Sequence, residues 1–353
     1  MSAFVKVFSN DFELTQKDFF VYRYYFVSNF CGADYFRLRG LLGRSDLAVR
    51  LFDNSTFDDA ITIQHGVLNK VGFSGKFVVD TALVKHAGSG NFVIDLTGHS
   101  YGIVLTEQCL DVSYQDKTIS EMIKDIASRI GFEADTEETT GKFSLSSGGS
   151  NLSSFIFNEL LPRAISRYAG GGQYVNFFCK FRDKKIIFKR LENLRDYNIE
   201  TSDLVSEPVF KFYRDTPSKR WTLVSWDINK DEPIVDDIYF DRFFFDFGRT
   251  GVKFENGVKV IAPTGTRENV LDYTIGSFAK SFSMNFIAIP FVGNEKNTDM
   301  EAPCVINFNY KIFSTPHFTS GKYLVLQSAH VITSERGSVE YKIIARCGRR
   351  YHV

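Results

Sequence analysis

Short apolar runs separated by Gly, Asn, Asp and Ser fill the N-terminal part of the chain, and they have the length and composition of β-strands. The clearest runs before residue 108 span residues 19–26, 48–52, 60–64, 76–84 and 92–96. Several short strands at close spacing are typical of a barrel or a sandwich, whereas alternating strands and helices would indicate a parallel α/β sheet. We therefore predict that residues 1–108 form a first β-barrel.

One phrase of this pattern occurs twice. Residues 74–79 read Ser-Gly-Lys-Phe-Val-Val, and residues 320–325 read Ser-Gly-Lys-Tyr-Leu-Val. Each copy opens a strand-like run that is followed by a second run, at 91–97 and at 338–345, which ends near Gly98 or Gly348. Self-similarity at this distance predicts two related β units within one chain.

Between these units the hydrophobic period changes from that of a strand to that of a helix. Apolar residues at 119, 122, 123, 126, 127 and 130 form the stripe of an amphipathic helix. Thr118 and Glu121 have the spacing of a capping box, and Gly131 stands where a left-handed residue would end the helix. The pattern therefore predicts a capped helix within residues 118–131.

Further elements complete an inserted unit at 109–204. A second helical segment is predicted at 153–169, bent at Pro162 and stopped by the glycines at 170–172. Strand-like runs at 174–181 and 185–191, around Arg182 and Asp183, predict a hairpin. Residues 109–204 are therefore expected to form an α/β insertion.

The β pattern returns at 205–235 and at 301–353, which we predict to form a second β-barrel. Residues 236–300 lie between its two parts and are expected to form a second insertion. The clearest element of that insertion is the run 252–261, where Asn256 and Gly257 are typical of a type I′ hairpin turn. The predicted fold class is mainly β with α/β insertions (α+β), built on two related antiparallel β-barrels, each followed or interrupted by an inserted subdomain.

The composition argues against one class of function, a dedicated DNA-binding protein. Lys plus Arg and Asp plus Glu both number 42, so the formal net charge is zero and the long-range field of a dedicated DNA-binding protein is missing. Local basic faces remain compatible with this balance. Aromatic residues make up 15 % of the chain, mostly Phe, which suits rings that pack across pleated strands.

The sequence offers no metal or cofactor site. Its five cysteines are far apart and are expected to be free thiols. No H-x-x-x-H pair or Cys–His cluster has zinc spacing, and the Gly-Lys pairs lack the spacing of a phosphate-binding loop. We also find no secretory signal in residues 1–10 and no apolar run near the ~18 residues that span a bilayer.

One catalytic hypothesis arises from Gly98-His99-Ser100-Tyr101-Gly102, which matches the G-x-S-x-G turn of serine hydrolases. Ser100 would be the nucleophile, with the base at His317 or His330 and an oxyanion turn at His65-Gly66. The following residues, 103–106, form a β-branched run, unlike the helix start that such an elbow requires. A turn that ends a strand is therefore favoured, and the serine hydrolase stays an alternative.

A second alternative is a carbohydrate- or receptor-binding β module. Such modules present exposed aromatic platforms, but Trp221 and Trp226 are five residues apart, which puts them on opposite faces of one strand. We predict no catalytic, cofactor-binding or metal-binding residues and no enzyme activity.

The order of elements resembles the baseplate hub proteins of contractile-tailed bacteriophages and the N-terminal hub part of type VI secretion spike proteins. The motifs that carry the resemblance lie at residues 49–53, 73–76, 96–100, 105, 118–132, 320–325, 330–332 and 341–344. They cover nearly the whole chain in order, although each is only a few residues long.

The resemblance implies a structural, non-enzymatic protein of the phage virion, made in the host cytoplasm. Three chains would form a homotrimeric ring of pseudo-six-fold symmetry, joining the tail tube to the central spike and leaving a channel for DNA. The implied partners are the tail spike protein, a tube or tube-initiator protein, baseplate wedge proteins and the tape-measure protein. DNA would pass without specific binding, and no small-molecule substrate is expected. Because the sequence ends at Val353, soon after the last predicted strands, we expect the spike to be a separate chain.

Overall fold

The structure is a computed structural model. It describes residues 3–9, 12–15, 18–43, 61–88, 91–103, 105, 108–167, 174–191, 194–210, 220–227, 229–239, 245–246, 258–261, 287–317, 319–335 and 338–351. The predicted run at 48–52, residues 252–257 of the predicted run 252–261, and the glycines at 170–172 lie outside these ranges.

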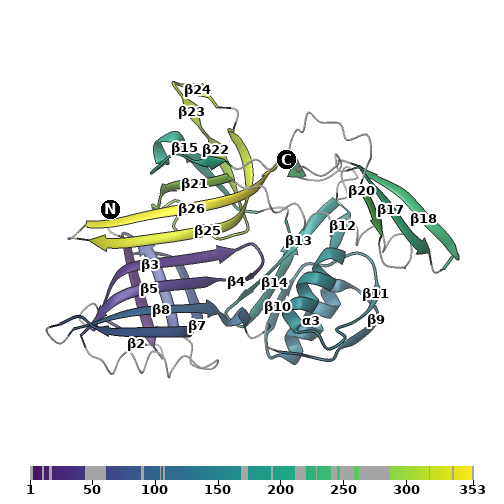
Figure 1. Ribbon diagram of the computed structural model, residues 1–353, viewed down its shortest axis with the longest axis horizontal. Coiled ribbons are helices and arrows are strands. Elements are labelled where there is room, and N and C mark those ends of the chain that lie inside the picture. The colour runs from purple at the N-terminus through teal and green to yellow at the C-terminus, as the bar shows by residue number, and fades with distance from the viewer. Residues whose placement is uncertain are drawn as a thin grey trace.

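A first β-barrel occupies the N-terminal part of the chain (Figure 1). Its main strands are β1 (Ala3–Ser9), β3 (Phe19–Asn29), β5 (Tyr35–Leu42), β6 (Ile61–Val67), β7 (Lys70–His86) and β8 (Phe92–Ser100). The short β2 (Phe12–Glu13) pairs with the end of β1. In β5 the residues alternate between buried Phe36 and Leu38 and outward-facing Arg37 and Arg39, because successive side chains point to opposite sheet faces. The main strands of this barrel are hydrogen-bonded in the order β1-β6-β7-β8-β5-β3.

A second β-barrel has the same strand order. Its strands are β15 (Asp196–Glu200), β16 (Val209–Phe210), β21 (Ile287–Val292), β22 (Cys304–Asn309), β25 (Gly321–Glu335) and β26 (Ser338–Tyr351). They pair as β15-β22-β25-β26-β21-β16, so each strand takes the place of one strand of the first barrel. One pair departs from this equivalence, because β15 runs parallel to β22 whereas β1 runs antiparallel to β6. The predicted pair of related β-barrels is confirmed.

The repeated phrase lies at the same place in both barrels. Phe77 of β7 pairs with Ile61, and Tyr323 of β25 pairs with Ile306, on equivalent strands. A β-bulge then interrupts the register after Val79 in one hairpin and after Val325 in the other. Bulges bend strands at defined points, so their shared position indicates that the two barrels are built in the same way.

The two barrels are joined edge to edge. Residues 321–325 of β25 pair with β22 of their own barrel, and residues 327–333 pair with β3 of the first barrel. The result is one 14-stranded sheet that continues from one barrel into the next (Figure 1). A single hydrophobic core includes Phe26, Phe36 and Phe73 from the first barrel and Phe291 and Ile343 from the second.

An α/β unit follows the first barrel and has its own core. Its elements are β9 (Ser113–Lys117), α3 (Ile119–Arg129), β10 (Glu133–Thr136), β11 (Phe143–Ser146), β12 (Ile165–Arg167), β13 (Tyr174–Arg182) and β14 (Lys185–Arg190). Strands β13 and β14 form the predicted hairpin, with Asp183 and Lys184 at positive φ in the turn. The short β4 (Gly32–Ala33) of the first barrel pairs with β13 and ties the unit to that barrel.

Helix α3 forms as the sequence predicts. The Thr118 side chain accepts a hydrogen bond from the Glu121 backbone, and the Glu121 carboxylate accepts one from the Thr118 backbone. Gly131 has a φ of 71° just beyond the helix. The expected apolar stripe is buried at Ile119, Met122, Ile123, Ile126 and Ala127.

The second helical segment is shorter than predicted. It consists of α4 (Leu152–Ser154), η2 (Phe155–Leu160) and η3 (Leu161–Arg163), and β12 begins at Ile165. Pro162 lies in the tight last turn, because proline fits the first positions of a helix and prevents its regular continuation. The prediction that helix continues to residue 169 was wrong.

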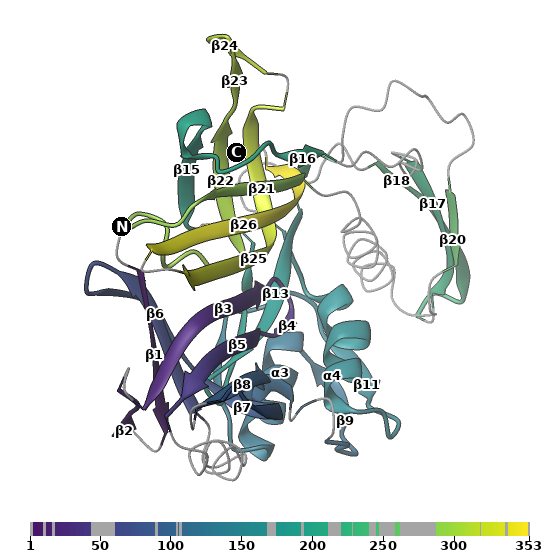
Figure 2. The same cartoon turned by 60° about the vertical axis from the view of Figure 1, so that its left-hand side comes forward.

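The C-terminal half divides differently from the predicted boundaries. Strands β17 (Arg220–Asp227), β18 (Glu232–Tyr239) and β20 (Val258–Ile261) form a separate three-stranded sheet that stands apart from both barrels (Figure 2). By pairing, β15 and β21 belong with the second barrel, although the sequence assigned them to insertions. Such short strands are held by pairing with distant strands, and their own residues do not show which sheet they join. We propose that the second barrel comprises residues 196–210 and 287–351.

A few short elements complete the chain. They are η1 (Tyr101–Ile103), η4 (Thr201–Asp203), β19 (Phe245–Asp246), which pairs with β26, and the small hairpin of β23 (Lys311–Ile312) and β24 (Thr315–Pro316). Among the described residues, no helix is long and apolar enough to cross a membrane.

Candidate functional site

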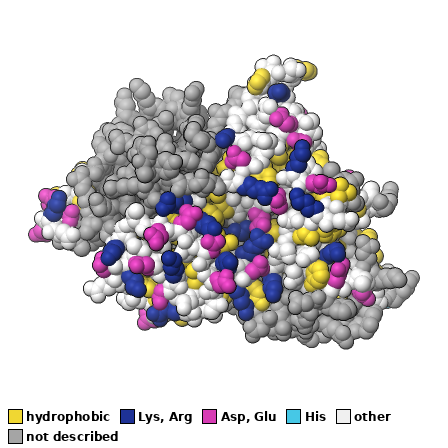
Figure 3. All heavy atoms as spheres, turned by 180° about the vertical axis from the view of Figure 1, so that it is seen from behind, with side chains coloured by type: hydrophobic (Ala, Val, Ile, Leu, Met, Phe, Trp, Pro, Cys, Tyr) yellow, Lys and Arg dark blue, Asp and Glu magenta, His cyan; other side chains and the backbone are white. Residues whose placement is uncertain are grey.

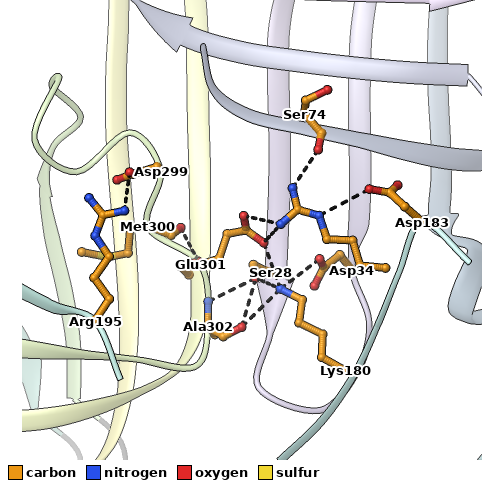
Figure 4. Close-up of polar contacts among 12 residues, drawn as sticks. Ser28, Asp34, Ser74, Lys180, Asp183, Arg195, Asp299, Met300, Glu301 and Ala302 are labelled. Atoms are coloured by element: carbon orange, nitrogen blue, oxygen red, sulfur yellow. Dashed lines mark hydrogen bonds and ion pairs between the residues drawn. The ribbon is translucent and has the colours of Figure 1, made fainter. Parts of the chain in front are cut away.

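The two barrels and the α/β unit meet at a polar cluster, which we call the joint (Figure 4). Ser28, Asp34, Lys180 and Ala302 of the joint are buried, and Arg182 and Glu301 are partly buried. Lys180 and Arg182 come from β13 of the α/β unit. Asp34 follows β4 of the first barrel, and Glu301 lies in the segment that leads into β22 of the second. The two barrels and the α/β unit thus each contribute at least one charged side chain to the joint.

Lys180 is the centre of the joint. Its ammonium lies 3.1 Å from an Asp34 carboxylate oxygen and 3.2 Å from a Glu301 oxygen. It also donates to the Ser28 hydroxyl at 2.6 Å and to the Ala302 carbonyl at 3.2 Å. A buried ammonium needs such complete pairing, because an uncompensated charge in the interior is strongly unfavourable.

Arg182 extends the same network toward solvent. Its guanidinium donates to both Glu301 oxygens, at 2.8 and 3.0 Å, and to the Ser74 carbonyl at 2.8 Å. The two cations balance the carboxylates of Asp34 and Glu301. Burial raises the pKa of Asp34 to about 6, while Lys180 and Arg182 hold the pKa of Glu301 below its ordinary value despite burial. All four groups are therefore charged at neutral pH, and the joint acts as a fixed connection between the units.

Ser100 lies at the edge of this joint, at the end of strand β8. It pairs with Phe77 within the strand, and the 3-10 turn η1 comes directly after it. The residue is 2 % exposed, and its hydroxyl donates to the Phe181 carbonyl at 3.2 Å and accepts from the Asp34 backbone at 3.1 Å. The hydroxyl is thus hydrogen-bonded within the protein.

The histidines considered as its partners lie elsewhere. His65 and His330 contact each other in the buried region between the barrels, 3.2 Å apart. The imidazole of His317 contacts Thr319, and that of His99 contacts Asp80. None of these contacts involves Ser100. The interpretation of Gly98–Gly102 as a strand-ending turn fits the structure.

A carbohydrate-binding module would need exposed aromatic side chains. Trp226 lies in β17 with 43 % of its surface exposed, and its indole nitrogen donates to Asp231 at 3.1 Å. The side chain of Trp221 lies outside the described set. In the parts of the chain that the structure describes, no group of three or more His, Cys, Asp or Glu residues has the arrangement of a metal site.

Sequence reasoning missed a basic cavity on the outer side of the sheet, where the two barrels join. Its volume is about 390 Å³, and the lining side chains that carry polar groups are Arg23, Tyr25, Tyr35, Arg37, Arg39 and Lys342. Alternation in β3 and β5 could have shown that these residues share a face, but only the β3–β25 pairing adds Lys342 to them. Seen from behind, the described surface carries interspersed acidic and basic side chains (Figure 3).

Comparisons with known proteins agree with this architecture. The tail protein from Neisseria meningitidis MC58 superimposes with a TM-score of 0.64 at 10 % identity, over 99 % of this chain and 97 % of that one. The prophage MuSo2 43 kDa tail protein from Shewanella oneidensis gives 0.63 at 10 % identity, over 97 % of both chains. The E. coli c3393 protein, a type VI secretion component described as structurally similar to T4 tail proteins gp27 and gp5, gives 0.58 at 8 % identity, over 99 % of this chain and 78 % of that one.

No family model matches the sequence, and no curated protein matches it. The likeness is therefore one of fold. The resemblance inferred from the order of elements is confirmed at that level, because solved tail proteins share the arrangement over nearly their whole length.

Proposed function

We propose that this chain is a structural baseplate hub of a contractile tail: a homotrimeric ring that joins the tail tube to the central spike and leaves a channel for DNA. The shared fold with phage tail proteins and a type VI secretion component supports a structural tail role. The observation that carries the proposal is the strand order that the two barrels share. One edge of each barrel pairs with the other barrel, and the equivalent edges, one on each barrel, have no partner strand among the described residues.

Within the chain, residues 327–333 of β25 pair with β3. The equivalent stretch of the first barrel is residues 81–86 of β7, which pairs with β8 on one side. Among the described residues, no strand pairs with its other side. In the second barrel, the strand equivalent to β3 is β16, which pairs with β21 on one side. The first barrel of one copy and the second barrel of the next copy thus have the two edges that the barrel–barrel contact requires.

The register of this contact follows from the pairings inside the chain. Val331 lies opposite Tyr25 in the existing contact. The equivalent residues, counted through the shared strand order, are Lys85 in β7 and Val209 in β16. Antiparallel partners have Cα atoms about 4.5–5.5 Å apart, so these two side chains would meet across the interface between copies.

The exposed side chains at these edges fit an interface. Leu83 and Val84 in β7 are 52 % and 39 % exposed, and Val209 is 55 % exposed. Unpaired strand edges with apolar side chains favour pairing with another chain, and native proteins cover them. A head-to-tail contact of this kind closes into a ring when its rotation allows. With two barrels per chain, three copies would present six similar barrels to a six-fold tube and three-fold symmetry to a spike.

The proposed partners follow from this geometry and from the resemblance. They are the tail spike protein, a tube or tube-initiator protein, baseplate wedge proteins and the tape-measure protein, within the virion tail of a phage or a related injection machine. DNA would pass through the channel without sequence-specific binding. The role is geometric, and no small-molecule substrate is proposed.

The contact can be tested by disulfide trapping. The double variant Lys85→Cys/Val209→Cys should link copies into a covalent trimer under oxidising conditions, because the expected Cα separation lies within the 4.4–6.8 Å that disulfides span. The control pair Thr81→Cys/Val209→Cys shifts one cysteine by four residues, roughly 13 Å along the strand, and should not link. A native mass of three times 40.2 kDa for the unmodified protein supports the trimer. A stable monomer, or equal trapping by both pairs, would refute the proposed contact.

A further inference from the structure

The basic cavity lies on the outer face of the sheet, at the seam between the barrels. Its cations come from three strands: Arg23 on β3, Arg37 and Arg39 on β5, and Lys342 on β26. All four point away from the core, as their buried neighbours Tyr24, Leu38 and Ile343 show. The cavity therefore gathers positive charge on an open face of the sheet.

Among the described residues, one carboxylate lies against these cations. Asp95 accepts two hydrogen bonds from Arg37, at 3.0 and 2.7 Å, and lies 3.2 Å from Arg39. The Nε atom of Arg39 is buried and has no hydrogen-bond partner. Glu340, two residues before Lys342 on the same strand, does not line the cavity. One acid among four cations leaves an excess of positive charge and unsatisfied donors.

The equivalent positions of the other barrel offer an internal comparison for each cation. By the shared strand order, the positions equivalent to Arg23, Arg37, Arg39 and Lys342 are Glu207, Ala288, Pro290 and Val93. None of these four residues is a cation, although Ala288, Pro290 and Val93 lie in the equivalent strands. The fold therefore does not require the arginines and the lysine, and their convergence at one seam needs another explanation.

We propose that this cavity binds phosphate-type oxyanions, supplied by a nucleic-acid backbone or by a free polyphosphate. Donors approach from three strands, which suits a tetrahedral oxyanion with acceptor oxygens in several directions better than a planar carboxylate with one edge. The hydroxyl groups of Tyr25 and Tyr35, which line the same cavity, add neutral donors. With a volume of about 390 Å³ the cavity has room for more than a single phosphate group.

In the proposed ring the site would occur once per chain, at alternate seams. The phosphate site itself does not depend on the ring, because every lining residue belongs to one chain. Contacts to phosphate would be independent of base sequence and would weaken with salt. Such contacts fit a protein of zero net charge, since they are local and few.

Binding should be measured on the full chain with pyrophosphate by calorimetry and with a labelled 20-base-pair duplex by fluorescence anisotropy, at low and high salt. The variant Arg23→Gln/Arg39→Gln/Lys342→Gln should weaken binding at least about tenfold. The control Lys124→Gln/Lys296→Gln/Lys311→Gln removes the same charge from exposed positions elsewhere and should bind like the unmodified chain.

The results of these measurements distinguish a nucleic-acid backbone from a free polyphosphate as the ligand. Binding of pyrophosphate and duplex, both lost in the cavity variant, indicates a backbone site, whereas binding of pyrophosphate alone indicates a free polyphosphate. Equal losses in the cavity and control variants would overturn the proposal, as would no binding of either probe. Tighter binding of a polyglutamate peptide than of pyrophosphate would also overturn it. Thermal melting of each variant checks that folding is retained.

Discussion

His65 of the first barrel and His330 of the second lie with their ring nitrogens 3.2 Å apart, fully buried between the two barrels. Nε2 of His330 donates to the Met300 carbonyl at 2.7 Å, so its Nδ1 is an acceptor and receives the Tyr341 hydroxyl at 2.7 Å. Two imidazoles in this position must both be neutral, because protonating either would bury a charge beside the other ring.

Acid should therefore loosen the contact between the barrels. Burial lowers the pKa of His330 to about 4 and lowers the pKa of His65 well below its ordinary value. Asp299 and Glu301 oppose this shift, and Lys180 favours it. Because the unfolded histidines take up protons from about pH 6.5, stability should fall from there down to about pH 4. The loss from His330 is on the order of 3 kcal/mol.

Denaturant unfolding across this pH range measures the effect. The His330→Asn variant should show a shallower decline than the unmodified chain, whereas His86→Asn, at an exposed position, should leave the profile unchanged. An identical decline in all three proteins would show that this pair does not couple the barrels to pH.

Breaking the joint should be costly. The Lys180→Met variant leaves the carboxylates of Asp34 and Glu301 without their central cation, and we expect a loss of about 3–5 kcal/mol in the free energy of unfolding. The pair of Lys142 and Asp116 is a matched surface control, with side chains 59 % and 74 % exposed. Lys142→Met should cost about 1 kcal/mol or less. Similar losses in the two variants would contradict the role of the joint.

Local features of the fold could be predicted from the sequence, and distant pairings could not. Helix α3 and the β13–β14 hairpin follow from capping residues, apolar spacing and turn chemistry within a few neighbours. The duplication was visible because the phrase at 74–79 recurs at 320–325 in equivalent strands.

No local sequence pattern predicts the joint or the pair of His65 and His330. Lys180 meets Glu301 across 121 residues, and His65 meets His330 across 265. Only the folded arrangement of barrels and α/β unit brings these residues together. The end of the second helical segment was missed for another reason: the apolar residues around Pro162 continue a helical pattern although the backbone turns into β12.

The capping box of α3 contributes measurable stability. Thr118→Ala removes the side-chain acceptor for the Glu121 backbone and should cost about 1 kcal/mol. Thr118→Ser keeps the hydroxyl and should stay close to the unmodified chain. Equilibrium denaturation distinguishes the two variants, and equal midpoints would show that the cap is not needed.

Ser100 should behave as a structural residue. We expect no labelling by a fluorophosphonate probe, because the hydroxyl is buried and bonded to Phe181 and Asp34. Ser100→Ala should lower the free energy of unfolding by about 1–3 kcal/mol through lost hydrogen bonds. Ser338→Ala, at an exposed position, should change it by about 0.5 kcal/mol or less. Labelling that disappears in Ser100→Ala would instead restore the hydrolase hypothesis.

The central claim is that two equivalent barrels per chain build a ring through one repeated contact. Electron cryomicroscopy of the purified protein tests it most directly. We expect a closed ring of three copies in which six barrels surround one axis, with β7 of each copy beside β16 of the next. Single copies, or rings in which these two edges stay apart, would contradict the account.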